Sequence, residues 1–121
     1  MVLMLTNFQQ LKKLPQHQIE IRYPKWPRAV SVSGPLLKDI LQETGWKGET
    51  IIVRGVDGYA PEFSRSDVES GQFVMALEAE GRPLSIGGRG PVWLVFPPHS
   101  YIDQDDSDSG LAWAVFNIEV R

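Results

Sequence analysis

The sequence predicts a single α+β domain over residues 1–121. A chain of 121 residues has the usual size of one domain with its own hydrophobic core. Hydrophobic residues make up 42% of it and charged residues 22%, as in ordinary folded globular proteins. The patterns below indicate about six short strands and two short helices in a segregated order, which favours α+β over a doubly wound α/β sheet.

The N-terminal third is predicted to contain one short helix and two strands. Residues 5–14 carry an apolar stripe at three-residue steps, with residues 6–7 offering an N-cap and Pro15 the terminator. Residues 18–23 alternate polar and apolar side chains, which is the pattern of a half-buried strand. Residues 30–35 are predicted to form a second strand that runs into a turn.

The middle of the chain is predicted to hold the second helix and two more strands. Residues 36–41 place four apolar side chains at helical spacing, and Gly45 provides the C-terminal stop. Residues 49–54 indicate a strand followed by a loop of turn formers, and Ser66 is expected to begin a capped turn. Residues 72–79 are predicted to form one continuous strand.

The C-terminal third is predicted to contain two strands and an unusual glycine loop. Residues 87–91, with the sequence GGRGP, lead directly into the strongly apolar residues 92–98, which indicate a buried strand. Residues 111–120 favour a closing strand. Between them lies an acidic stretch that is interpreted as a solvated loop, because it lacks the spaced glycine and terminal glutamate of a calcium loop. Its acidic residues are Asp103, Asp105, Asp106 and Asp108.

Composition and motifs disfavour several classes of function. A formal net charge of −3 offers no basic surface for nucleic acid. The absence of cysteine excludes disulfides, cysteine-zinc sites and thiol nucleophiles, and it leaves the compartment open. His17 and His99 are the only histidines and lack ligand spacing, which disfavours a metal site. No serine lies in a GxSxG motif, which disfavours a hydrolase triad.

The glycine loop at residues 87–91 is the first candidate ligand-binding segment. It lacks both the GxGxxG and the P-loop patterns, so it does not predict a nucleotide site. Its amides can approach a planar or anionic ligand closely, and the Arg89 guanidinium offers a forked set of donors. Taken alone, the loop is equally well interpreted as a solvent-facing hairpin turn.

Two further segments carry candidate ligand contacts. Asp57 and Tyr59 place a carboxylate and a phenol around a glycine, which suits an amino-substituted ring or, alternatively, an Asx-turn that caps itself. Trp26 lies in a loop flanked by prolines and is the candidate stacking residue. The other tryptophans are more readily interpreted as core residues, namely Trp46, Trp93 and Trp113.

Several segments in a fixed order resemble the sulfite-oxidase-type molybdopterin-binding domain. The order is SGPLLKDIL at 33–41, then Gly45, VDGY at 56–59, ALEAEGRP at 76–83, GPVWLVFP at 90–97, Trp113, and IEV at 118–120. The resemblance covers about residues 30–120, which is most of the chain. It implies a sulfite-oxidase-like fold of mostly short mixed strands with two or three short helices.

The chain departs from that family at two positions that matter for chemistry. The family's enzymes bind molybdenum through a cysteine thiolate, and this chain has no cysteine. The enzymes also tend to carry an arginine two residues after the proline of the Gly-Pro segment, where this chain has Trp93. We therefore expect no molybdenum and no oxygen-atom transfer, and we expect the protein not to be an enzyme.

The chain looks more like small, stand-alone pterin-binding members of the family, which act as ligand sensors. That resemblance implies an unconjugated pterin as ligand and a membrane-anchored partner, such as a cyclase or phosphodiesterase of cyclic di-GMP. The chemistry agrees in kind, because a pterin needs a stacking aromatic, a carboxylate for its amino edge and donors for its carbonyl. The expected pterin contacts are Trp26, Asp57, Tyr59, Gly88, Arg89, Gly90 and Trp93.

The resemblance also implies a periplasmic location. Residues 1–5 are too short and uncharged to be a signal peptide, so an exported form is expected to have lost its signal. No apolar stretch reaches the length of a membrane-spanning helix, and no direct membrane insertion is expected. Two alternatives remain open: a molybdopterin-dependent oxidoreductase, or its cofactor-binding subunit, with metal ligation from elsewhere, and an empty scaffold that mediates only protein contacts.

Overall fold

The computed structural model describes the chain except for residues 6–7, 85–89, 102–103 and 105–106. Three short helices and ten strands form within the described residues, which confirms an α+β fold. The helices are α1 (Phe8–Lys13), α2 (Leu37–Thr44) and α3 (Arg65–Ser70). The strands are β1 (Val2–Met4), β2 (His17–Ile21), β3 (Val30–Gly34), β4 (Thr50–Gly55), β5 (Glu62–Ser64), β6 (Val74–Ala76), β7 (Glu78–Ala79), β8 (Arg82–Pro83), β9 (Trp93–Val95) and β10 (Val115–Val120).

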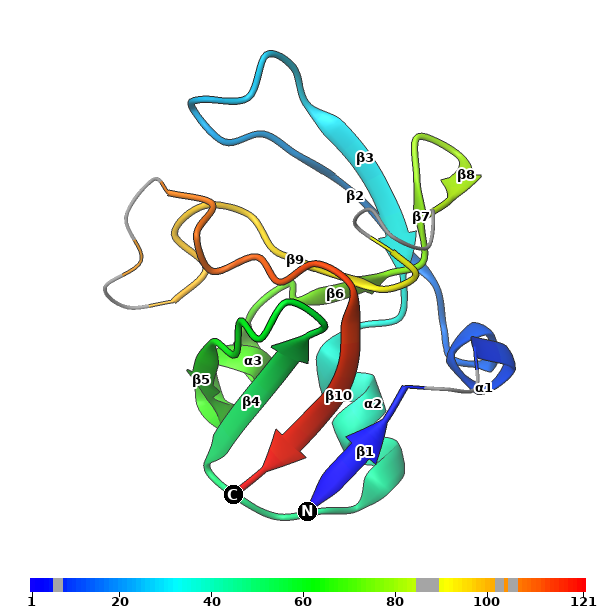
Figure 1. Cartoon of the computed structure of the whole chain (residues 1–121), viewed down its shortest axis with the longest axis vertical. Helices are drawn as coiled ribbons and strands as arrows, with labels where there is room; N and C mark the ends of the chain where they lie inside the picture. Colours follow the sequence, from blue (N-terminus) through cyan, green and yellow to red (C-terminus); the bar gives the residue numbers. More distant parts are fainter. Residues whose placement is uncertain (6–7, 85–89, 102–103, 105–106) are drawn as a thin grey trace.

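The described strands form three antiparallel sheets. One sheet has the order β1-β10-β4-β5, a second has the order β2-β3-β7-β8, and β6 pairs with β9 in a small third sheet. The small sheet links the other two. Its β6 side is joined to the chain after β3 through the bond from Met75 N to Pro35 O, and its β9 side is joined to the β10 segment through the bond from Val115 N to Val92 O. Figure 1 shows β6 and β9 crossing between the β2–β3 hairpin and the β1-β10-β4-β5 sheet.

Alternating burial explains how the terminal strands pack. Leu3 pairs with Ile118, which belongs to the buried core. Val2 pairs with Glu119, which belongs to the outer face of the sheet, where its carboxylate lies 2.6 Å from Arg54 Nη2 and 2.6 Å from Arg121 Nε. The first and last strands are thus neighbours in one sheet, and the two termini lie close together (Figure 1).

The end of α2 and the beginning of α3 lie at residue types that favour helix ends. In α2, Leu37, Ile40 and Leu41 are buried, and Gly45 ends the helix in the left-handed conformation with a φ of 68°. In α3, the Ser64 side chain accepts a bond from Asp67 N and so caps the helix. The cap lies two residues before the Ser66 that the sequence indicated, because Ser64 closes β5 and presents its hydroxyl to the first turn.

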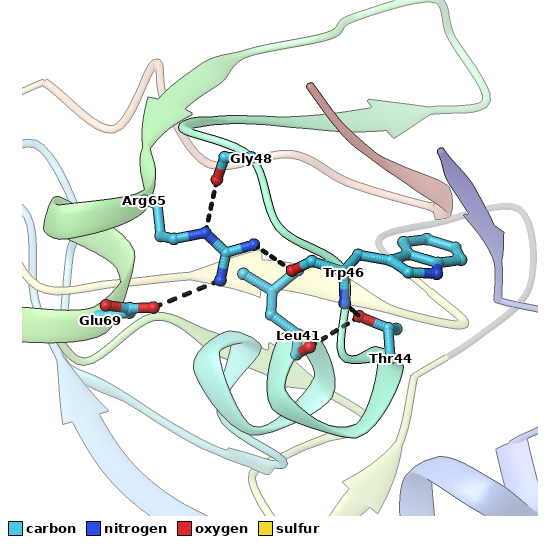
Figure 2. Close-up of polar contacts among 6 residues, drawn as sticks. All are labelled: Leu41, Thr44, Trp46, Gly48, Arg65 and Glu69. Carbon is cyan, nitrogen blue, oxygen red and sulfur yellow. Dashed lines mark hydrogen bonds and ion pairs between the residues drawn. The ribbon is translucent and has the colours of Figure 1, made fainter.

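Arg65 fastens α3 to the connection between α2 and β4. Its guanidinium donates to Gly48 O at 2.5 Å and to Trp46 O at 2.7 Å, and it lies 3.3 Å from the Glu69 carboxylate (Figure 2). Only 18% of the Arg65 side chain is exposed, so these donors are satisfied by fixed backbone carbonyls rather than by water.

Two sequence predictions about strands were incomplete. Residues 72–79 do not form one strand: β6 and β7 belong to different sheets and are separated at Leu77, whose N–H bonds to Ser33 O. The short strands β1, β5 and β8 were not predicted, because two or three residues give too little alternation to reveal a period. The remaining predicted helices and strands are observed, with ends shifted by a few residues.

Candidate functional site

Three loops meet at one side of the molecule. They connect β2 to β3, β4 to β5, and β9 to β10, and in Figure 1 the β9–β10 loop lies between the other two. Side chains at Tyr23, Trp26 and Tyr59 hold the β9–β10 loop through hydrogen bonds to Gln104, Asp108 and Ser109 respectively. We call this set of six residues the three-loop junction.

Trp26 anchors the first of these loops. Its indole Nε1 donates to Asp108 Oδ2 at 2.7 Å. Its ring stacks on Trp93 at 6.1 Å between ring centroids and an angle of 29°, and it packs against Tyr23 at 5.1 Å. Trp26 is half-buried and Trp93 is buried, so Trp26 lies nearer the surface of this pair. Trp93 thus lies beneath Trp26 as a core residue, and the role of Trp26 as a stacking surface for a ligand stays a prediction.

Asp57 and Tyr59 shape the second loop. Asp57 Oδ1 accepts a 3.0 Å bond from Tyr59 N, so the Asx-turn suggested as an alternative interpretation is present. The Tyr59 hydroxyl donates to Ser109 O, although the Tyr59 side chain remains 43% exposed. The Asp57 side chain is also exposed, and no described residue bonds to its Oδ2 atom. Asp57 thus uses one oxygen to hold the turn and keeps the other for solvent or a ligand.

Tyr23 ties the start of the β9–β10 loop to the core. Its hydroxyl donates to Phe96 O at 2.6 Å and accepts from Gln104 Nε2 at 3.1 Å. Burial raises the pKa of the Tyr23 phenol to about 12, although the Gln104 hydrogen bond acts in the opposite direction. The phenol therefore stays neutral and keeps donating to Phe96 O over the whole physiological range of pH.

The β9–β10 loop also contains unusual backbone conformations. His99 and Ala114 have positive φ angles of 60° and 50°, and Glu80 is the other non-glycine residue of this kind among those described. Such conformations cost free energy and persist only where surrounding contacts impose them. At His99 and Ala114 in the β9–β10 loop, local backbone preference thus gives way to tertiary contacts.

A small hollow of about 260 Å³ opens beside the junction and is lined by Arg22, Tyr23, Pro24 and Pro98. It combines a guanidinium, an aromatic ring and two rigid prolines, which are groups that suit a flat ligand with acceptor atoms. Sequence reasoning did not select Arg22 or Tyr23. The signal was weak, since both were read only as the end of a strand that runs into a proline.

The structure places some of the predicted site residues at or beside the three-loop junction. Trp26, Trp93 and Tyr59 belong to or adjoin the junction, and Asp57 holds the turn that carries Tyr59. Gly90 is buried, and a side chain there would meet Leu84, because an added Cβ would lie 2.5 Å from Leu84 Cβ. The remaining two, Gly88 and Arg89, lie outside the described residues.

Asp108 is the contact that sequence reasoning missed most clearly. The acidic stretch was interpreted as a solvated loop, and Asp103, Asp105 and Asp106 lie outside the described residues. Asp108 is exposed, as that interpretation expects, and it also accepts the Trp26 hydrogen bond, while Leu111 N bonds back to the Asp108 carbonyl. A single aspartate with a distant partner leaves no periodic or motif signal. Only the fold brings Asp108 next to Trp26.

No three His, Asp or Glu side chains in the described part of the chain group closely enough to hold a metal ion. None of the helices described here is long and apolar enough to cross a membrane. Comparison of the chain with protein-family models found no match, and comparison with curated protein sequences found none either.

Proposed function

We propose that this protein is a non-catalytic pterin-binding sensor with a sulfite-oxidase-like fold, and that it regulates a membrane-anchored signalling partner. The observation that carries the proposal is the three-loop junction. Trp26 and Tyr59, two of the residues expected to contact a pterin, are 33 positions apart by number, yet they bond to the consecutive residues Asp108 and Ser109.

The chemistry of the described groups suits a pterin. A flat heterocycle with amino and oxo substituents needs an aromatic surface, a carboxylate and a donor. Trp26 offers the surface, Asp57 Oδ2 offers an acceptor for the amino edge, and Arg22 offers a guanidinium at the neighbouring hollow. Arg89 remains a second proposed donor on the strength of the sequence alone. The bound pterin acts through its shape and its hydrogen bonds alone. It carries no molybdenum, because the chain has no cysteine to bind that metal.

A route from ligand to partner follows from the same contacts. Trp26 and Tyr59 both bond to the β9–β10 loop, so a ligand that moves either ring also shifts residues 108–109. A ligand changes the surface offered to a partner only if it binds the two loop positions with different free energy. We propose that the pterin stabilises one position of this loop and that the partner recognises that position.

The test is a titration of purified protein with tetrahydrobiopterin and with oxidised biopterin, followed by quenching of tryptophan fluorescence. Saturable quenching is expected for one of the two forms, and Asp57→Ala and Arg89→Ala are expected to weaken it. Asp67→Ala is the matched control, because Asp67 lies in α3 away from the junction. No saturation with either pterin, together with no effect of the two site variants, contradicts the proposal.

Metal analysis and the absorbance of heat-released material separate this proposal from the oxidoreductase alternative. Molybdenum in a one-to-one ratio with protein supports the enzyme. A metal-free fluorescent pterin supports the sensor. A broad screen without any pterin hit supports a scaffold that mediates only protein contacts.

A further inference from the structure

A second and larger hollow lies away from the three-loop junction, between the N-terminal segment and α2. Its volume is about 570 Å³, which falls within the usual range of small-molecule pockets. Apolar side chains make most of its wall, and Leu5, Leu11 and Ile40 are each at most 6% exposed. The lining residues are Leu3, Met4, Leu5, Gln10, Leu11, Lys13, Leu14, Ile40, Glu43, Thr44 and Trp46.

Hydrogen bonds of the Trp46 backbone hold this residue in place on the wall of the hollow. Its N–H donates to Thr44 Oγ1 at 3.1 Å, and its carbonyl accepts from Arg65 at 2.7 Å. Figure 2 shows the indole directed away from Arg65. The indole Nε1 has no hydrogen-bond partner among the described residues, so it remains available as a donor. The hollow thus has a positioned aromatic ring with an available N–H.

The charges around the hollow are unevenly placed. Gln10 and Lys13 are three residues apart on α1, which puts them on the same side of that helix and provides an amide and an ammonium as donors. Glu43 lies on α2 and is the one acidic residue of the described lining. An anionic group is therefore attracted toward α1 and repelled from α2.

We propose that this hollow is a second binding site that takes a monoanionic amphiphile with an apolar ring body. The ring body packs against Leu11, Ile40 and Trp46, and the anionic group lies toward Lys13 and Gln10. Glu43 orients the ligand by repelling its anionic group from the α2 side. The site is separate from the three-loop junction and does not depend on pterin binding there.

A pair of naphthalene dyes tests the proposal. The anionic probe is 8-anilinonaphthalene-1-sulfonate, and the uncharged probe is N-phenyl-1-naphthylamine, which has the same ring body without the sulfonate. Both are expected to bind the intact protein saturably with enhanced fluorescence. Lys13→Gln is expected to weaken binding of the anionic dye by about fivefold, as for a solvent-exposed ion pair, and to leave the uncharged dye unchanged.

Lys12→Gln is the matched control. Lys12 is the neighbouring cation on α1 but does not line the hollow. The Lys12→Gln substitution therefore removes the same charge without changing the site. Glu43→Gln is expected to strengthen binding of the anionic dye, and Trp46→Phe to weaken both dyes. Asp57→Ala, in the turn that carries Tyr59, is expected to change neither. Equal effects of Lys12→Gln and Lys13→Gln, or an absence of saturable binding, overturn the proposal and leave the proposed pterin site unaffected.

Discussion

The indole N–H of Trp26 bonds to the carboxylate of Asp108, a residue 82 positions away, at 2.7 Å. This contact joins the proline-flanked β2–β3 loop to the β9–β10 loop, which Tyr59 also holds through Ser109. Loops normally vary in position because few contacts restrain them. Here side-chain hydrogen bonds from two different connections converge on consecutive residues, and this convergence defines the candidate site.

Removing the Asp108 acceptor is expected to loosen the junction without unfolding the protein. Asp108→Ala leaves the Trp26 N–H to water at a half-buried position, so we expect a loss of about 1 kcal/mol in the free energy of unfolding. Asp108→Asn keeps an oxygen acceptor and is expected to lose less. Urea denaturation of the two variants measures the difference. Wild-type stability in both variants would contradict the role of the Asp108 carboxylate as the acceptor.

Tyr23→Phe is expected to destabilise the protein more than either Asp108 variant. The change leaves the Phe96 carbonyl and the buried Gln104 amide without their bonds to the hydroxyl, which costs about 1 to 3 kcal/mol. Chemical denaturation at neutral pH provides the measurement. Tyr59→Phe is the control, since it removes an exposed phenol hydroxyl from the same junction and is expected to cost less.

The raised pKa of Tyr23 also predicts how stability changes at high pH. The unfolded chain releases the phenol proton near the ordinary pKa of 10, whereas the folded protein holds it to about 12. The folded state therefore binds more protons in this range, and stability falls as pH rises from 10 to about 12. Unfolding of wild type across this window should show the fall, and Tyr23→Phe should show a smaller one. An identical slope in both proteins would contradict the assignment to Tyr23.

The lowered pKa of Glu119 predicts that stability falls as the pH decreases in the acid range. Hydrogen bonds from Arg121 and Arg54 lower the pKa of this carboxyl from its ordinary 4.5 to about 2. The unfolded chain binds the proton first, so this contribution to stability is present above pH 4.5 and is lost as pH falls toward about 2. Acid unfolding of Glu119→Gln should be less steep in this window than that of wild type. Glu20→Gln, on an exposed position of β2, removes one carboxylate outside the network and should retain the wild-type slope.

Two glycines are expected to differ in their tolerance of alanine. An added Cβ at Gly34 would lie 2.1 Å from Met75 O, where β3 runs against β6, so Gly34→Ala is expected to cost about 3 kcal/mol. Gly45 has open space around it, and only its φ of 68° opposes a side chain, so Gly45→Ala is expected to cost about 1 kcal/mol. Thermal unfolding of both variants checks the order. A larger loss at Gly45 would contradict the close packing of β3 on β6.

Local signals in the sequence were sufficient for much of the fold. The helix at Leu37–Thr44 and its stop at Gly45 follow from apolar spacing and from the freedom of glycine to adopt positive φ. The strand Thr50–Gly55 follows from a run of β-branched residues. The break between β6 and β7 could not be predicted, because it depends on which distant strand each half pairs with.

The candidate site was also predictable only where its residues carry a local signal in the sequence. Trp26 stood out because of its flanking prolines, and Asp57 and Tyr59 because of the turn that they share. The partners Asp108, Ser109 and Gln104 had no such signal, since their contacts join residues that are far apart in the chain. Trp93 was expected both as a core residue and as a pterin contact, and its 1% exposure places it in the core beneath Trp26.

Calorimetric titration with tetrahydrobiopterin tests the central claim most directly, using wild type, Trp26→Leu and Trp113→Leu. Trp113 is the control, because it is half-exposed and was not assigned to the site. The account predicts saturable binding of one pterin per chain, weakened about tenfold by loss of the stacking ring in Trp26→Leu and unchanged in Trp113→Leu. No saturable heat with tetrahydrobiopterin or oxidised biopterin, or equal affinity in wild type and Trp26→Leu, would contradict it.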